Sequence, residues 1–141
     1  MKWIAIPAIL VLGGCVPFPI YKTLQPQLEI TVVDDQSKPI HGAIVALISS
    51  SSPYGEEKSR EVRLTYRGGE VKFPKRSEWR VEVLMIHGIE VFFWNWCIEK
   101  EGFLTYETQY GDDEILRSNT LIELEPGESE ACTVPYQRFK P

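Results

Sequence analysis

The chain has 141 residues, of which 43% are hydrophobic and 25% are charged, and its formal net charge is −5. This length and balance are typical of one globular domain and exclude a wholly disordered chain. The mild acidity, with no Lys/Arg cluster, also argues against nucleic acid as a partner, because binding to phosphates needs a basic face.

The N-terminus has the organisation of an export signal. Lys2 provides positive charge, Trp3–Leu12 is uncharged and almost entirely apolar, and two glycines follow. A positive start, a short apolar run and small residues are typical of a secretory signal peptide. The apolar run is shorter than the roughly 20 residues that span a bilayer. The alternative is an uncleaved anchor over the uncharged residues 3–20, but Pro17 and Pro19 would break its last helical turns.

The sequence LGGC at residues 12–15 resembles the lipobox of bacterial lipoproteins, which has an aliphatic residue, two small residues and then a cysteine. The resemblance implies that Cys15 carries diacylglycerol, that residues 1–14 are removed as a signal peptide, and that the new amino terminus is acylated. Two acyl chains already give stable membrane anchoring. In that family Val16, rather than Asp, after the cysteine favours the outer membrane, with the domain facing the periplasm.

Lipidation of Cys15 would leave two of the three cysteines, Cys97 and Cys132. The periplasm is oxidising, so we expect these two to form a disulfide bond. Two separate buried thiols are the alternative, because the sequence does not show that the two residues approach each other.

The remaining chain predicts an all-β protein. Residues 15–27 contain three prolines and predict an extended tether, residues 28–135 one β-sandwich domain, and residues 136–141 a C-terminal tail. Alternation and β-branched residues predict strands that are separated by turn residues. These strands are expected at residues 28–33, 40–48, 61–66, 70–73, 79–86, 89–99, 103–109, 120–125 and 131–134. We expect the strand at 79–86 to pair with the aromatic strand that follows it, and we expect a short helix or an irregular loop within residues 107–119.

The segment LEITVVDDQSKPIHGAIVAL resembles the opening of carboxypeptidase-regulatory-like and transthyretin-like domains. Those domains begin with a strand, an acidic turn, Pro-Ile, a spacer, Gly-Ala and an alternating strand. The matching residues here are Val33, Asp34, Pro39, Ile40, Gly42, Ala43, Val45 and Leu47. The resemblance implies a seven-stranded Greek-key sandwich that serves as a structural or interaction module and not as a catalyst.

Two segments are candidates for binding. Trp94 and Trp96 in FFWNWC share one face of a strand, where they form either the sandwich core or an exposed recognition patch. The segment from Ser49 to Lys58, SSSSPYGEEK, predicts a polar loop that contains Tyr54. Such a loop either binds a partner or simply connects two strands.

The sequence contains no strong signature of catalysis or metal binding. His41 and His87 are isolated, GESEA (127–131) lacks the final glycine of a nucleophile elbow, and GDDE (111–114) lacks the spacing of a calcium loop. We therefore expect no metal and no cofactor. The preferred hypothesis is a non-enzymatic, membrane-anchored periplasmic lipoprotein that binds or supports an envelope protein. The alternatives are an immunity or inhibitor lipoprotein, which acts against a toxin or a wall-degrading enzyme, and a small envelope hydrolase.

Overall fold

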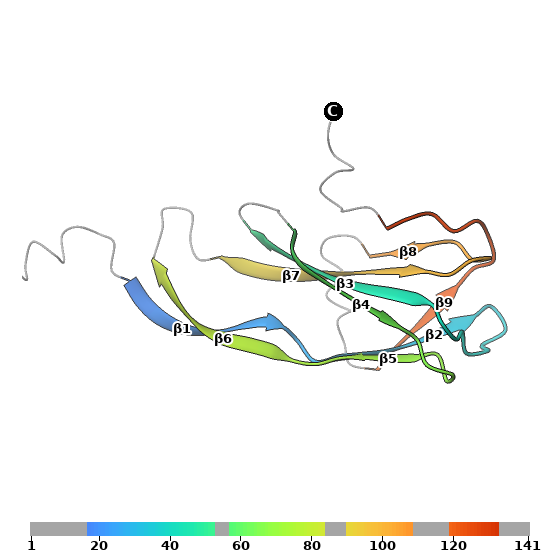
Figure 1. The fold of residues 1–141 in the computed structure, drawn as a ribbon, viewed down its shortest axis with the longest axis horizontal. Coiled ribbons are helices and arrows are strands. Elements are labelled where there is room, and N and C mark those ends of the chain that lie inside the picture. Colours follow the sequence, from blue (N-terminus) through green and yellow to red (C-terminus); the bar gives the residue numbers. More distant parts are fainter. Residues whose placement is uncertain (1–16, 53–56, 84–89, 109–118, 133–141) are drawn as a thin grey trace, which may run out of the picture.

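The computed structural model describes residues 17–52, 57–83, 90–108 and 119–132, and this part of the chain forms strands, turns and irregular segments without any helix (Figure 1). The prediction of an all-β fold is confirmed. The described residues form nine strands rather than seven. They are β1 (Pro17–Gln25), β2 (Leu28–Asp34), β3 (Ile44–Ser52), β4 (Glu57–Leu64), β5 (Glu70–Phe73), β6 (Arg76–Val83), β7 (Val91–Glu99), β8 (Tyr106–Glu107) and β9 (Thr120–Leu124).

Two packed sheets form the body of the sandwich. One has the strand order β5-β2-β9 and the other the order β4-β3-β7-β8. All pairings are antiparallel except that of β2 with β9, which is parallel. The chain crosses between the two sheets from β2 to β3 and from β4 to β5.

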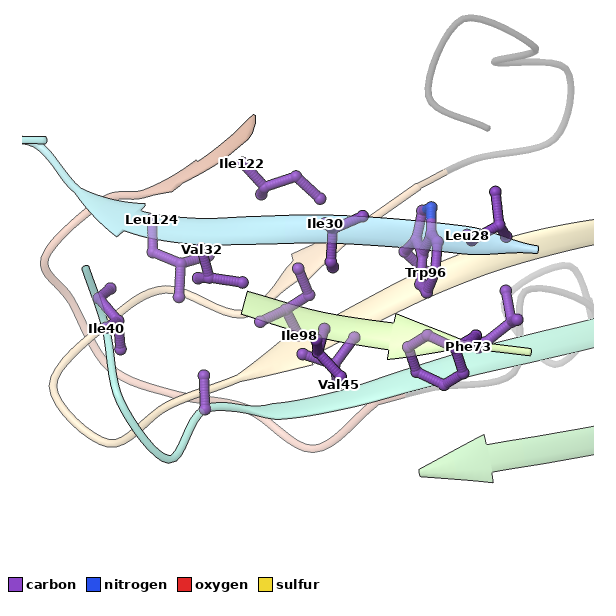
Figure 2. Close-up of a cluster of buried hydrophobic side chains, with 13 residues drawn as sticks. Leu28, Ile30, Val32, Ile40, Val45, Phe73, Trp96, Ile98, Ile122 and Leu124 are labelled. Carbon is purple, nitrogen blue, oxygen red and sulfur yellow. The ribbon is translucent and has the colours of Figure 1, made fainter. Parts of the chain in front are cut away.

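The core lies between these two sheets (Figure 2). Alternate residues of each strand point inward, as the period of two in a β-strand requires. Trp96 from β7 and Phe73 from β5 contact each other with ring centroids 5.2 Å apart. Aliphatic side chains fill the rest of the cluster, namely Leu28, Ile30, Val32, Ile40, Ala43, Val45, Leu47, Val71, Ile98, Ile122 and Leu124.

Strands β1 and β6 form a third, two-stranded sheet, which is continuous with the pairing of β2 and β5. Pro26 and Gln27 separate β1 from β2, and Pro74 and Lys75 separate β6 from β5. A proline provides no backbone N–H, so the hydrogen-bond ladder is interrupted there. The four strands thus follow one another as two consecutive strand pairs. We call the pair β1 and β6 the β1–β6 ribbon, and it runs beside the far ends of β3, β4 and β7 (Figure 1).

The segment predicted as a tether is therefore largely a paired strand. Residues 17–25 lie in β1, so β-structure begins before residue 28, where we had predicted the domain to start. The register shifts by one residue between Thr23 and Gln25, which makes Leu24 a β-bulge. The sequence signal was misleading because Pro17 and Pro19 suggest an unpaired chain, whereas an edge strand tolerates proline.

Two further expectations are wrong. The strand that begins near Trp79 pairs with β1 and not with β7, whose neighbours are β3 and β8. Ser49–Ser52 continue β3 and pair with β7, and Ser49 and Ser50 also pair with β4, so the predicted loop contains strand residues at both of its ends. Ser49, Ser50 and Ser51 are buried.

The predicted turns between β2 and β3 and between β4 and β5 are present. Asp34 Oδ1 accepts hydrogen bonds from the backbone N–H groups of Gln36 and Lys38. Gly69 has a φ of +75°, and a Cβ at this position would lie 2.4 Å from the carbonyl oxygen of Val32. Both the backbone angle and the close approach therefore require glycine at this turn.

The C-terminal part of the domain contains less strand than predicted. Strand β8 has two residues, and Ala131 and Cys132 lie outside any strand. The helix or loop expected within 107–119 and the tail at 136–141 fall largely or wholly outside the described residues.

Candidate functional site

Trp96 belongs to the core and is not accessible to a partner. It is 1% exposed, and its ring packs edge-on against Phe73. The core interpretation of this residue is confirmed, and the recognition-patch interpretation is excluded for it. Its indole Nε1 has no hydrogen-bond partner among the described residues, in keeping with an almost entirely apolar surrounding.

Trp94 also faces the interior, but it has a second contact. The side chain is half-buried against the core cluster, and its indole N–H donates a hydrogen bond of 2.8 Å to the carbonyl oxygen of Leu24. Leu24 is the bulge residue of β1. Trp94 therefore holds the β1–β6 ribbon, which consists of residues 17–25 and 76–83, against the four-stranded sheet.

Two other candidate residues, Cys15 and Tyr54, lie outside the described part of the chain. For the loop that was expected around Tyr54, the neighbouring residues are informative. Ser51 is fully buried beside β7, so the serines at the start of the predicted loop belong to the sheet.

Cys97 and Cys132 form a disulfide bond, as predicted, with their Cα atoms 5.9 Å apart. Cys97 lies on the outer face of β7, opposite to Trp96, and packs with Ala46 and Ile48. The bridge attaches the C-terminal segment to this face, where the N–H of Cys132 also donates to Glu99 Oε1 at 2.7 Å.

The side chains of Cys97, Cys132 and Glu107 place their ligand-type atoms within 4.8 Å of one another. Metal binding by cysteine needs a thiolate, and the disulfide uses both sulfur atoms. These residues therefore form a covalent crosslink that lies beside a carboxylate, and they do not fit a metal site in the oxidised protein.

Charged side chains fill the space between the ribbon and the four-stranded sheet. Lys22 forms an ion pair with Glu82, and Arg80 contacts Glu90 at 3.2 Å. Both cations also lie over the ring of Phe92, at 5.3 and 5.8 Å from its centroid. Of these groups, Arg80, Glu90 and Phe92 line a hollow of about 270 Å³ that opens to solvent.

The electrostatics of this layer favour the ionised form of Glu90. Burial alone raises the pKa of Glu90, but the neighbouring Ser51 side chain and the charges of Arg80, Lys58 and Lys22 outweigh it, so that the pKa is lowered overall. Glu90 therefore acts as an anion that holds cations from β6 and β4 in place.

A second polar network lies where the ribbon leaves the core. Gln25 is buried and donates to Glu61 at 2.9 Å and to the carbonyl oxygen of Pro74 at 2.8 Å. Arg76 contacts Gln25 and Glu61 in turn. Burial raises the pKa of Glu61, but the hydrogen bonds from Gln25 and Arg63 and the two arginine charges lower it overall.

The outer face of the ribbon is apolar. Its residues form three cross-strand pairs, Tyr21 with Trp79, Pro19 with Val81 and Pro17 with Val83. Trp79 is 72% exposed, Val81 71% and Tyr21 58%. The two aromatic rings contact each other with centroids 5.3 Å apart. The inner face carries the charged residues Lys22, Arg80 and Glu82 together with the half-buried Phe18 and Ile20, so this face is mixed, whereas the outer face is apolar over these three pairs.

A second exposed apolar surface lies on strands β3 and β4 and the turn that follows β4. We call it the β3–β4 strip, and it consists of Ile44, Val62, Leu64 and Tyr66. Ile44 and Leu64 are directly paired across the two strands, and Tyr66 is 71% exposed. Leu64 and Tyr66 line a shared hollow of about 530 Å³.

The prediction from sequence missed both surfaces. The alternation of Trp79, Val81 and Val83 with charged residues is visible in the sequence, but an alternating strand normally turns its apolar face inward. Here that face points outward, because Arg80 on the other face is paired with Glu90, directly before β7, and lies over the ring of Phe92 in β7.

In the described part of the chain, no helix is long and apolar enough to cross a membrane.

Comparison of the chain with protein-family models, with curated proteins and with solved structures found no match.

Proposed function

We propose that this chain is a lipid-anchored protein of the bacterial envelope whose β-sandwich is a non-enzymatic module for binding or assembling a protein partner. The anchor is proposed at Cys15, two residues before β1 begins at Pro17. The disulfide between Cys97 and Cys132 supports export, because such bonds persist in oxidising compartments.

The observation that carries the binding role is the β3–β4 strip. Its four large apolar side chains are more than two-fifths exposed, and two of them, Leu64 and Tyr66, line a hollow. Contiguous apolar surface of this kind is typical of an interaction site. Arg63 and Lys72 also line the hollow, so an apolar segment with neighbouring acidic residues would complement it.

The titratable groups also favour binding over catalysis. A general acid needs a raised carboxyl pKa, but in the described part of the chain the carboxylates with a resolved shift, Glu61 and Glu90, both have a lowered pKa and are both held by cations. Structural ion-pair networks produce shifts of this kind.

The anchor is tested with Cys15→Ser. We expect wild-type protein to be acylated and to float with membranes, and the variant to accumulate as an unprocessed precursor. Identical migration and fractionation of the two proteins would contradict the lipoprotein proposal.

The binding surface is tested in intact cells with a photo-crosslinking amino acid at Leu64. The matched control places the same amino acid at Leu121, an equally exposed leucine on the outer face of β9. We expect a discrete protein adduct from position 64 that is absent from position 121 and that Tyr66→Asp abolishes. Equal adduct patterns at both positions would exclude the β3–β4 strip as the binding surface.

A further inference from the structure

The outer face of the β1–β6 ribbon is apolar, unlike the outer face of β2 and β5. In β2 and β5 the apolar side chains face the core, and the outer face contains charged residues such as Glu29 and Lys72. In β1 and β6 the charged pair Lys22–Glu82 lies inside, and the outer face has no charge from Pro17 to Tyr21 or at its paired positions. Both strands of the ribbon therefore contribute side chains to the exposed apolar face.

From these observations we propose that the outer face of the β1–β6 ribbon lies against the lipid surface of the membrane and orients the sandwich on it. This inference rests on the proposed lipid anchor at Cys15. The occupant is a phospholipid bilayer interface, and the contact residues are Tyr21, Trp79, Val81 and Val83 together with Pro17 and Pro19.

The position of the anchor supports this occupant. One residue separates Cys15 from Pro17, so the two Cα atoms are at most about 7 Å apart. Acyl chains on Cys15 would hold the start of β1 at the bilayer surface. Because Pro17 pairs with Val83, the end of β6 would be held there as well.

The chemistry of the face also fits a lipid interface. Tyr and Trp prefer the headgroup level of a membrane, where a ring with one polar atom meets both lipid and water. Tyr21 and Trp79 form a contacting pair at one end of the face, and Val81 and Val83 continue it towards the end that is nearer Cys15. At Thr23 and Ser77, whose hydroxyl groups lie 3.3 Å apart, the face becomes polar.

The size of the face argues against a second copy of the chain as the occupant. Three cross-strand pairs extend about 14 Å along strands that lie about 4.8 Å apart. This surface is far smaller than the roughly 800 Å² that each partner buries in a stable dimer. An anchored protein needs no such area, because the acyl chains supply the affinity and the ribbon needs only to set the orientation.

The charged inner face explains why the ribbon can present this surface without folding it inward. Arg80 and Lys22 contact Glu90, Glu82 and the ring of Phe92, which together retain the cations under the ribbon. A ribbon turned over would bury its outer apolar face, but it would also separate Arg80 from Glu90 and remove both cations from the ring of Phe92.

The test uses the mature lipidated protein in vesicles of phosphatidylethanolamine and phosphatidylglycerol, with part of the phosphatidylethanolamine carrying brominated acyl chains. Bromine quenches a tryptophan that lies at the bilayer. We expect brominated lipid to reduce the emission of the wild-type protein and to leave that of Trp79→Phe almost unchanged, because Trp94 and Trp96 lie within the sandwich. Val81→Asp should reduce the quenching of Trp79, whereas Leu121→Asp, the matched change on β9, should not.

Equal quenching in the wild-type protein and in Trp79→Phe would overturn the proposal. Protection of Trp79 from aqueous acrylamide without quenching by brominated lipid would also overturn it, in favour of a second copy as the occupant. Flotation of the same vesicles reports separately on the anchor. Protein that floats with an unquenched Trp79 contradicts the ribbon inference alone, and wild-type protein that does not float contradicts the anchor on which it rests.

Discussion

The indole N–H of Trp94 donates a hydrogen bond of 2.8 Å to the carbonyl oxygen of Leu24. This bond joins β7, a strand of the sandwich, to the bulge in β1 at which the ribbon leaves the core. The aromatic segment that the sequence marks as a candidate recognition patch thus fixes the position of the ribbon.

Trp94→Phe should loosen the ribbon without unfolding the sandwich. Phenylalanine keeps an aromatic ring at this site but cannot donate to Leu24, and the loss of a hydrogen bond of this type costs about 1 kcal/mol. We expect faster amide hydrogen exchange in β1 and unchanged exchange in β2. The control is Trp79→Phe, which removes an exposed indole from β6 of the ribbon and should leave the exchange in β1 unchanged. Unchanged exchange in β1 would show that other contacts hold the ribbon.

Trp96→Ala should destabilise the whole domain. Truncation of a fully buried tryptophan costs about 3–5 kcal/mol, which is a large share of a typical stability of about 5–15 kcal/mol. Thermal unfolding should show a much lower midpoint, or the protein should be degraded in the cell. Trp79→Ala is the matched control, and its effect should stay within about 0.5 kcal/mol because Trp79 is exposed. A Trp96→Ala protein that melts like the wild type would contradict the core role.

Removal of the bridge between Cys97 and Cys132 should also lower stability. The two residues are 35 positions apart, and in the entropic model a loop of this size contributes about 3–4 kcal/mol. We expect no free thiol in the denatured, unreduced mature protein, and a lower melting temperature for the double variant Cys97→Ala/Cys132→Ala. Two reactive thiols in protein taken directly from the periplasm would contradict the bridge.

Acid should weaken the contact between the ribbon and the sandwich through Glu90. The folded-state pKa of Glu90 lies below its ordinary value, so its contribution is complete above the unfolded pKa of about 4.3 and is lost as the pH falls through the folded value. We expect the melting temperature to fall as the pH is lowered below 5. The Glu90→Gln variant should have a lower melting temperature than the wild type at neutral pH, and its melting temperature should fall less on acidification. An identical pH dependence of both proteins would show that the ionisation of Glu90 does not stabilise the fold.

The sequence by itself determined most of the strands of the sandwich and much of the core. Alternation in LEITVV and in the segment from Val91 to Glu99 is a local property, since a strand places successive side chains on opposite faces. The same rule placed Trp94 and Trp96 on one face and Cys97 on the other. Turn residues such as Asp34 and Gly69 were also identifiable, because their roles depend on neighbouring backbone atoms.

Only the tertiary structure decided which strands pair and which face of the ribbon is covered. Pairing of β1 with β6 joins residues about 60 positions apart, and no local pattern encodes such a partner. Alternation assigns Trp79 and Arg80 to opposite faces but does not say which face is buried. That choice depends on how β6 packs in three dimensions, where Glu90 and Phe92 hold Arg80 inward and leave Trp79 exposed.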